Sequence, residues 1–202
     1  MWGRPEVPSL IVRFDAPSFE PLEPILDELE GLPVWGAVGW PLVVGVGPTL
    51  IHHLRHGGLQ TVFDLRLWES KDRAVMITET LVRAGAQALT VDLRTELATV
   101  QACREAARGQ LLLIGATGLG AGDVAADVER LASGLDGVML PPQWLSVGDR
   151  FPHRWALLDR CTLSDLPSPA TATARVVSAE ALSEGDPAQV VAHLIDASQG
   201  VA

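Results

Sequence analysis

Three ionisable residues lie within one short, otherwise apolar stretch of this sequence, Phe63 to Glu69. Thr61 to Leu67 has the composition of a buried strand, and residues two apart on a strand share a face, so Asp64 and Arg66 are expected to point the same way. Charges inside an apolar strand cost free energy unless they are paired or used in chemistry. The stretch therefore predicts either a reactive acid and guanidinium, with Glu69 at its end, or an internal ion pair.

The rest of the chain alternates between strand and helix signals. Strands are expected at 10–15, 33–38, 61–67, 88–93, 110–116, 137–140, 154–159 and 172–177. Helices are expected at 19–30, 48–55, 70–84, 95–108, 121–133 and 186–197, with 39–41 a loop and 163–169 at most a helical turn. This alternation predicts a parallel sheet, and eight units predict one α/β domain over residues 1–202, a compact (β/α)8 TIM-type barrel.

An open, doubly wound sheet is the competing architecture. Such a sheet often carries a glycine fingerprint for dinucleotides after its first strand, but Asp15-Ala16-Pro17-Ser18 stands there instead. The dinucleotide interpretation is therefore disfavoured, and we expect no cofactor.

In a barrel the active site lies at the carboxyl ends of the strands. The candidate catalytic residues there are Asp64, Arg66, Glu69 and Asp92, and the candidate substrate-binding residues are Asp15, Trp40, Thr117 and Gln143. Four acids around one arginine predict perturbed pKa values. Alternatively, Asp15 and Glu69 only begin the following helices, where acids favour the helix dipole.

Composition limits the partners. The chain has 202 residues and a formal net charge of −10, which argues against nucleic acid or an anionic membrane surface. No apolar run approaches the ~20 residues of a membrane span. Two cysteines make neither a disulfide framework nor a zinc site, and the pair His52/His56 lacks accompanying ligands, so no metal is expected. We expect a cytoplasmic protein that binds a small molecule.

Several stretches resemble the superfamily of orotidine 5'-monophosphate decarboxylase, hexulose-6-phosphate synthase and 3-keto-gulonate-6-phosphate decarboxylase. The similar segments are Leu10 to Asp15, Val38 to Val43, Asp64 to Glu69 with the spacing of the Asp-x-Lys-x-x-Asp signature, Leu135 to Val138 with Gln143 after it, and Asp186-Pro187. The resemblance covers nearly the whole chain. It implies a barrel, a lyase activity, and a homodimer in which the residue at the Glu69 position reaches the neighbouring site.

The departures from the family pattern concern both chemistry and binding. Arg66 stands where the signature has lysine, and Ala37 where the second strand has an acid or lysine. The usual phosphate-binding Gly-Arg falls on Ser178-Ala179, and only a shifted alignment would recover Arg175. Arginine, unlike lysine, effectively cannot donate a proton. Ordinary decarboxylation of orotidine monophosphate and a magnesium site are therefore both disfavoured.

Two functions follow as hypotheses. The first is a diverged lyase-type enzyme acting on a small, non-phosphorylated organic acid or carbonyl compound, in which Asp64, Glu69 and Asp92 transfer protons and Arg66 binds an anion. The second is a catalytically inactive paralogue that serves as a binding or scaffold subunit. For the second, the tryptophans near strand ends and loops would wall a pocket or meet a partner: Trp35, Trp40, Trp68 and Trp144.

Overall fold

Eight parallel strands close into a barrel in which each strand pairs with its neighbours in chain order, and β8 returns to β1. The computed structural model describes residues 7–47, 50–56, 58–117, 122–158 and 172–182, together with 189, 191, 192 and 195. The strands are β1 (Leu10–Phe14), β2 (Val34–Val38), β3 (Gln60–Leu67), β4 (Ala88–Asp92), β5 (Leu112–Ala116), β6 (Gly137–Leu140), β7 (His153–Leu158) and β8 (Ala174–Ser178). The expected (β/α)8 fold is confirmed, and the open sheet is wrong.

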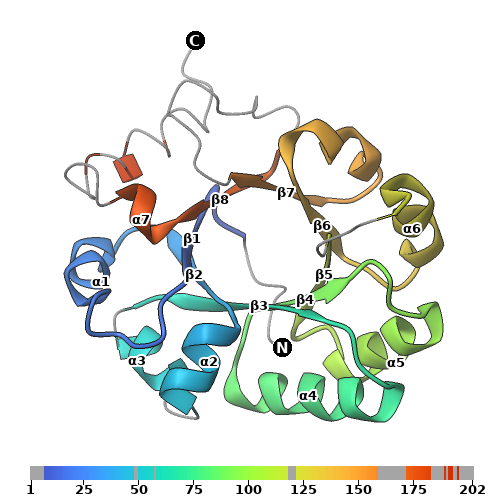
Figure 1. The fold of residues 1–202 in the computed structure, drawn as a ribbon, viewed down its shortest axis with the longest axis horizontal. Helices are drawn as coiled ribbons and strands as arrows, with labels where there is room; N and C mark the ends of the chain where they lie inside the picture. Colours follow the sequence, from blue (N-terminus) through green and yellow to red (C-terminus); the bar gives the residue numbers. More distant parts are fainter. Residues whose placement is uncertain are drawn as a thin grey trace.

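Helices surround the ring of strands (Figure 1). They are α1 (Glu23–Leu29), α2 (Trp40–Val46), α3 (Leu50–His56), α4 (Lys71–Ala84), α5 (Leu97–Ala107), α6 (Val124–Leu131), the 3-10 helix η2 (Pro142–Gly148) and α7 (Ala179–Leu182). The expected loop at 39–41 is wrong, because helix α2 begins at Trp40 with Pro41 in its first turn, where the fixed φ of proline suits a helix. Helix η2 was not expected. The expected segments 163–169 and 186–188 lie outside the described residues.

Strand alternation divides the core into two layers. One set of side chains fills the barrel interior, including Ile11, Trp35, Val62, Ile114 and Trp155, and the other packs between the strands and the helices. Trp35 and Trp155 meet edge to face inside the barrel, with ring centroids 6.3 Å apart. Trp35 is only 3% exposed, and it also lines a cleft of about 610 Å³ with Pro33 and Gln60, at the amino ends of β2 and β3.

Candidate functional site

Strand β3 departs from regular pairing where its charged residues lie. Between two paired positions, Phe63↔Leu89 and Leu67↔Val91, β3 advances by four residues while β4 advances by two. The extra residues form an arch, and within it Arg66 has a φ of 45°, a left-handed conformation that is uncommon for a residue other than glycine. Strain of this kind persists where surrounding contacts fix the backbone, and it is frequent at functional sites.

Three side chains satisfy the backbone groups that the arch removes from the sheet. Trp40 Nε1 donates to the Leu65 carbonyl at 2.9 Å, and the backbone N–H of Arg66 donates to Thr90 Oγ1 at 2.8 Å. Thr95 Oγ1 donates to the Leu67 carbonyl at 3.0 Å. Buried backbone groups need such partners. The indole N–H of Trp40, a predicted substrate-binding residue, therefore binds the protein, while the residue as a whole is 49% exposed.

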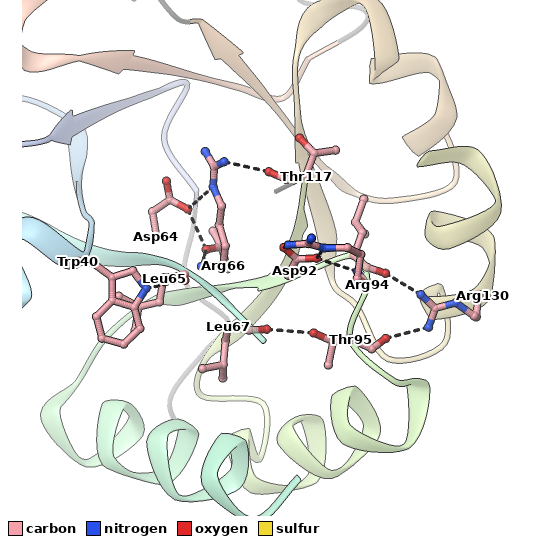
Figure 2. A network of polar contacts seen from close by, with 12 residues as sticks. Trp40, Asp64, Leu65, Arg66, Leu67, Asp92, Arg94, Thr95, Thr117 and Arg130 are labelled. Atoms are coloured by element: carbon pink, nitrogen blue, oxygen red, sulfur yellow. Dashed lines mark hydrogen bonds and ion pairs between the residues drawn. The ribbon is translucent and has the colours of Figure 1, made fainter. Parts of the chain in front are cut away.

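Asp64 and Arg66 lie together inside the mouth of the barrel, as expected. Arg66 Nε is 3.7 Å from Asp64 Oδ1, and the same oxygen accepts a hydrogen bond of 2.8 Å from Thr90 Oγ1. The Asp64 side chain is 6% exposed and that of Arg66 is 32% exposed. Figure 2 shows both groups projecting to the same side of β3, away from α4 and α5. The pair is an internal ion pair that still reaches the mouth.

Arg66 also spans to the end of β5. Its Nη1 donates to the backbone carbonyl of Thr117 at 2.9 Å (Figure 2). Thr117 was predicted to bind substrate, and the structure shows that its carbonyl oxygen binds the Arg66 guanidinium. The planar fork of arginine is thereby fixed in orientation by contacts on two sides.

Asp92 forms a close pair with Arg94, a residue that the sequence analysis did not select. Oδ1 accepts from the backbone N–H and from Nε of Arg94, both at 2.8 Å, and Oδ2 accepts from Nη2 at 2.7 Å. Burial alone would raise the pKa of Asp92, but the hydrogen bonds from Arg94, followed by the charges of Arg94 and Arg66, outweigh it and lower the pKa. The Arg94 guanidinium also lies over the Trp68 ring, with Cζ 4.3 Å from the ring centroid.

The expectation of four acids around one arginine is wrong. On β1, Arg13 Nε donates to Asp15 Oδ2 at 2.6 Å, so each acid at the ends of β1, β3 and β4 has an arginine two residues away in the chain. Three carboxylates thus face three guanidinium groups, and the pairs are locally neutral. The perturbed pKa expected at the site is confirmed for Asp92, but its direction is downward and its cause is Arg94.

Two predicted residues lie outside this network. Glu69 is 3.6 Å from Arg73 in an exposed pair at the start of α4, and Gln143 is exposed in η2. Within the described residues, neither has a hydrogen bond or ion pair to Asp64, Arg66 or Asp92. The structure therefore brings together Asp64, Arg66 and Asp92, with Thr117 beside them, and leaves the catalytic assignment of Glu69 untested.

A cleft of about 600 Å³ lies beside the network, between the ends of β1 and β8. Its polar lining includes Arg13, Asp15, Ser178 and Glu180, and its apolar wall comes from the β1–α1 segment. Asp15, predicted to bind substrate, is 42% exposed there. Arg175 lies in the middle of β8 between two residues of the interior cluster, so strand alternation points its side chain out of the barrel, away from this mouth.

Sequence reasoning missed Thr90 and Arg94. For Thr90 the available signal was a threonine at an interior position of a buried strand. For Arg94 the signal was an arginine two residues after a buried aspartate.

No group of three or more potential metal ligands occurs among the residues that the structure describes. Nor does that part of the chain contain a helix long and apolar enough to cross a membrane.

The fold and the mouth define a (β/α)8 barrel with charged groups at its strand ends, and solved structures share this fold. Two are orotidine 5'-phosphate decarboxylases, from Lactobacillus acidophilus and from Pyrococcus horikoshii OT3, with TM-scores of 0.77 and 0.76 and 19% identity each. The matches cover 96% and 95% of this chain, respectively, and 100% of each decarboxylase chain. An uncharacterized conserved protein from Geobacillus kaustophilus has a TM-score of 0.76 and 21% identity, over 94% of this chain and 99% of its own.

No protein-family model and no curated protein sequence matches the chain. The likeness to the decarboxylase structures confirms the barrel fold that the sequence resemblance implied.

Proposed function

We propose that this chain is a diverged member of the orotidine monophosphate decarboxylase superfamily, a lyase-type enzyme acting on a small, non-phosphorylated organic acid or carbonyl compound. The observation that carries the proposal is the Asp64–Arg66 pair, a buried carboxylate beside a fixed guanidinium inside the mouth of the barrel. Fixed charges of this kind stabilise charge that develops during a reaction.

The residues have different roles in this proposal. Arg66 binds the carboxylate or oxyanion of the substrate and keeps its charge throughout, because a guanidinium effectively cannot lose its proton. Asp64, with one oxygen held by Thr90, transfers the proton. Asp92 is held on both oxygens by Arg94 and stays ionised, so it contributes a fixed negative charge. Glu69 remains a candidate only through the resemblance, in which it would act in a neighbouring subunit.

The proposal excludes a phosphorylated substrate because carboxylates line the cleft beside the mouth. The described cleft between β1 and β8 is lined by two carboxylates, Asp15 and Glu180, and Asp15 accepts a hydrogen bond from Arg13. Glu180 also lies in the first turn of α7, where a dianion would otherwise be favoured. The carboxylates of this lining would repel a phosphate group, and they offer hydrogen-bond acceptors to the hydroxyl groups of a substrate.

The experiment is a turnover screen of small acids and carbonyl compounds with mass-spectrometric detection of products. A substrate found in this way should be turned over about 100-fold or more slowly by Asp64→Asn and by Arg66→Gln. Glu79→Gln, which removes an exposed acid paired with Arg83 on α4, is the control and should keep the wild-type rate. A rate unchanged in both site variants would contradict the assignment.

The second candidate is the inactive scaffold subunit. It is favoured by the internal pairing of all three strand-end acids and by three exposed tryptophans, Trp40, Trp68 and Trp144. Native mass spectrometry with candidate partner proteins tests it. Turnover that disappears in Asp64→Asn would rule it out.

The assembly and the location are also proposals. We propose a homodimer, which follows from the resemblance, and a cytoplasmic location, which agrees with the free, buried thiol of Cys103. A monomeric mass at micromolar concentration would contradict the dimer.

A further inference from the structure

Asp64 Oδ2 and Arg66 Nη2 have no protein hydrogen bond among the described residues. Asp64 Oδ1 accepts from Thr90 and faces Arg66 Nε, which leaves Oδ2. Arg66 Nη1 donates to the Thr117 carbonyl, which leaves Nη2 with two N–H groups. Figure 2 shows the carboxylate and the guanidinium side by side, projecting away from the helices. The pair therefore presents one acceptor next to one charged donor.

We propose that this pair recognises a carboxylate that carries a hydrogen-bond donor on the adjacent carbon, as in a 2-hydroxy acid or a 2-amino acid. The carboxylate binds Arg66 Nη2, and the hydroxyl or ammonium group donates to Asp64 Oδ2. The inference rests on the proposed function in taking this mouth as the substrate site, and it specifies the class of acid.

The donor is required because of the charge of Asp64. A plain carboxylate on Arg66 would lie close to a second carboxylate, and like charges at such a site repel. The Asp64 side chain is only 6% exposed. A plain carboxylate would also cover its Oδ2 without donating a hydrogen bond to that atom. Leaving a buried charged acceptor unsatisfied costs more free energy than a typical hydrogen bond gains. A donor on the adjacent carbon removes both penalties.

The geometry is set before a ligand arrives. Thr90 Oγ1 fixes the carboxylate of Asp64 and the backbone N–H of Arg66 at the same time, each at 2.8 Å, and the Thr117 carbonyl fixes the guanidinium from the other side. Groups that are already oriented lose little conformational entropy on binding. The two free atoms therefore act as a preset two-point site.

The test measures binding of three probes of similar size, namely acetate, glycolate and glycine. Titrations followed by the NMR signal of the Arg66 Nε–H group give dissociation constants without requiring turnover. We expect glycolate or glycine to bind at least about tenfold more tightly than acetate, the effect of one hydrogen bond to a charged group. The stronger of the two identifies the donor as neutral or cationic. If acetate binds as tightly as both, the proposal is overturned.

Asp64→Asn makes the test specific. The amide oxygen of the substituted side chain is expected to take the place of Oδ1, because Thr90 Oγ1 donates to Oδ1 and the Arg66 guanidinium lies 3.7 Å from it. This leaves an NH2 group at the position of Oδ2. That group cannot accept a hydrogen bond. The advantage over acetate should therefore disappear in Asp64→Asn, and it should persist in the surface control Glu79→Gln. An advantage retained in Asp64→Asn would assign the donor to another acceptor and contradict the proposal.

The two proposals can fail separately. If glycolate or glycine binds with the expected preference but no acid is turned over, the lyase function is wrong and the two-point site stands. If an acid without an adjacent donor is turned over with Asp64 and Arg66 both required, the lyase function stands and the two-point site is wrong.

Discussion

The Arg94 side chain binds both oxygens of Asp92, with Nε 2.8 Å from Oδ1 and Nη2 2.7 Å from Oδ2. The two residues are near neighbours in the β4–α5 segment, yet they form a planar, two-bond contact of the kind that arginine makes best. Asp92 is almost fully buried by it, and Trp68 covers the guanidinium from the other side.

Arg94→Met should destabilise the protein. It leaves the Asp92 carboxylate buried with only its backbone hydrogen bond, so the free energy of unfolding should fall. Urea denaturation measures it. The double variant Asp92→Asn/Arg94→Met should recover part of the loss, because no uncompensated charge remains. A single variant as stable as the wild type would contradict this account of the pair.

The same pair makes stability depend on pH on the acid side. The pKa of Asp92 in the folded protein lies below its ordinary value of 3.8, so its contribution is complete above that value. As the pH falls below it, the unfolded chain takes up the proton first, and the contribution is lost as the pH drops through the lowered folded pKa. Urea unfolding at several values between about pH 3 and about pH 7 should show a smaller acid-side loss in Asp92→Asn/Arg94→Met than in the wild type.

Thr90→Val should loosen the β3 arch. Valine has nearly the same shape but neither donates to Asp64 nor accepts from Arg66, so we expect a loss of about 1–3 kcal/mol. Hydrogen exchange at the Arg66 amide, measured by NMR, should become faster. Thr90→Ser keeps the hydroxyl and should keep the slow exchange. Equal protection of that amide in the valine and serine variants would argue against the hydroxyl as its partner.

The sequence predicted the barrel because its evidence is local and repeated in every unit. The alternation of side chains along a strand also predicted correctly that Asp64 and Arg66 lie on the same face of β3. The arch was not predictable, because it depends on how β3 pairs with β4, a relationship between distant residues that no pattern within β3 records. Arg94 was missed for a related reason. The expected helix at 95–108 followed the expected strand at 88–93 almost directly, so Arg94 was interpreted only as the connection between them. Its side chain instead turns back onto the strand end.

Gly45→Ala tests how α2 reaches the mouth. A Cβ at this position would lie 1.7 Å from the Pro17 carbonyl oxygen, so α2 and the β1–α1 segment would have to separate. We expect a lower melting temperature and a loss of at least about 1–3 kcal/mol. Gly122→Ala is the matched control, since no atom of the described residues lies within 4 Å of the corresponding Cβ. Equal melting temperatures for the two variants would contradict this close approach.

The Asp–Arg pairs at the ends of β1, β3 and β4 have a consequence for the speed of ligand encounter. Opposite charges a few ångströms apart cancel at a distance, so an approaching anion first feels the net charge of −10 of the whole chain, which repels it. Salt screens that repulsion over about 8–10 Å but weakens the contact with a partly buried guanidinium much less. Association of an anionic ligand should therefore become faster as ionic strength rises, opposite to an enzyme that attracts its ligand electrostatically.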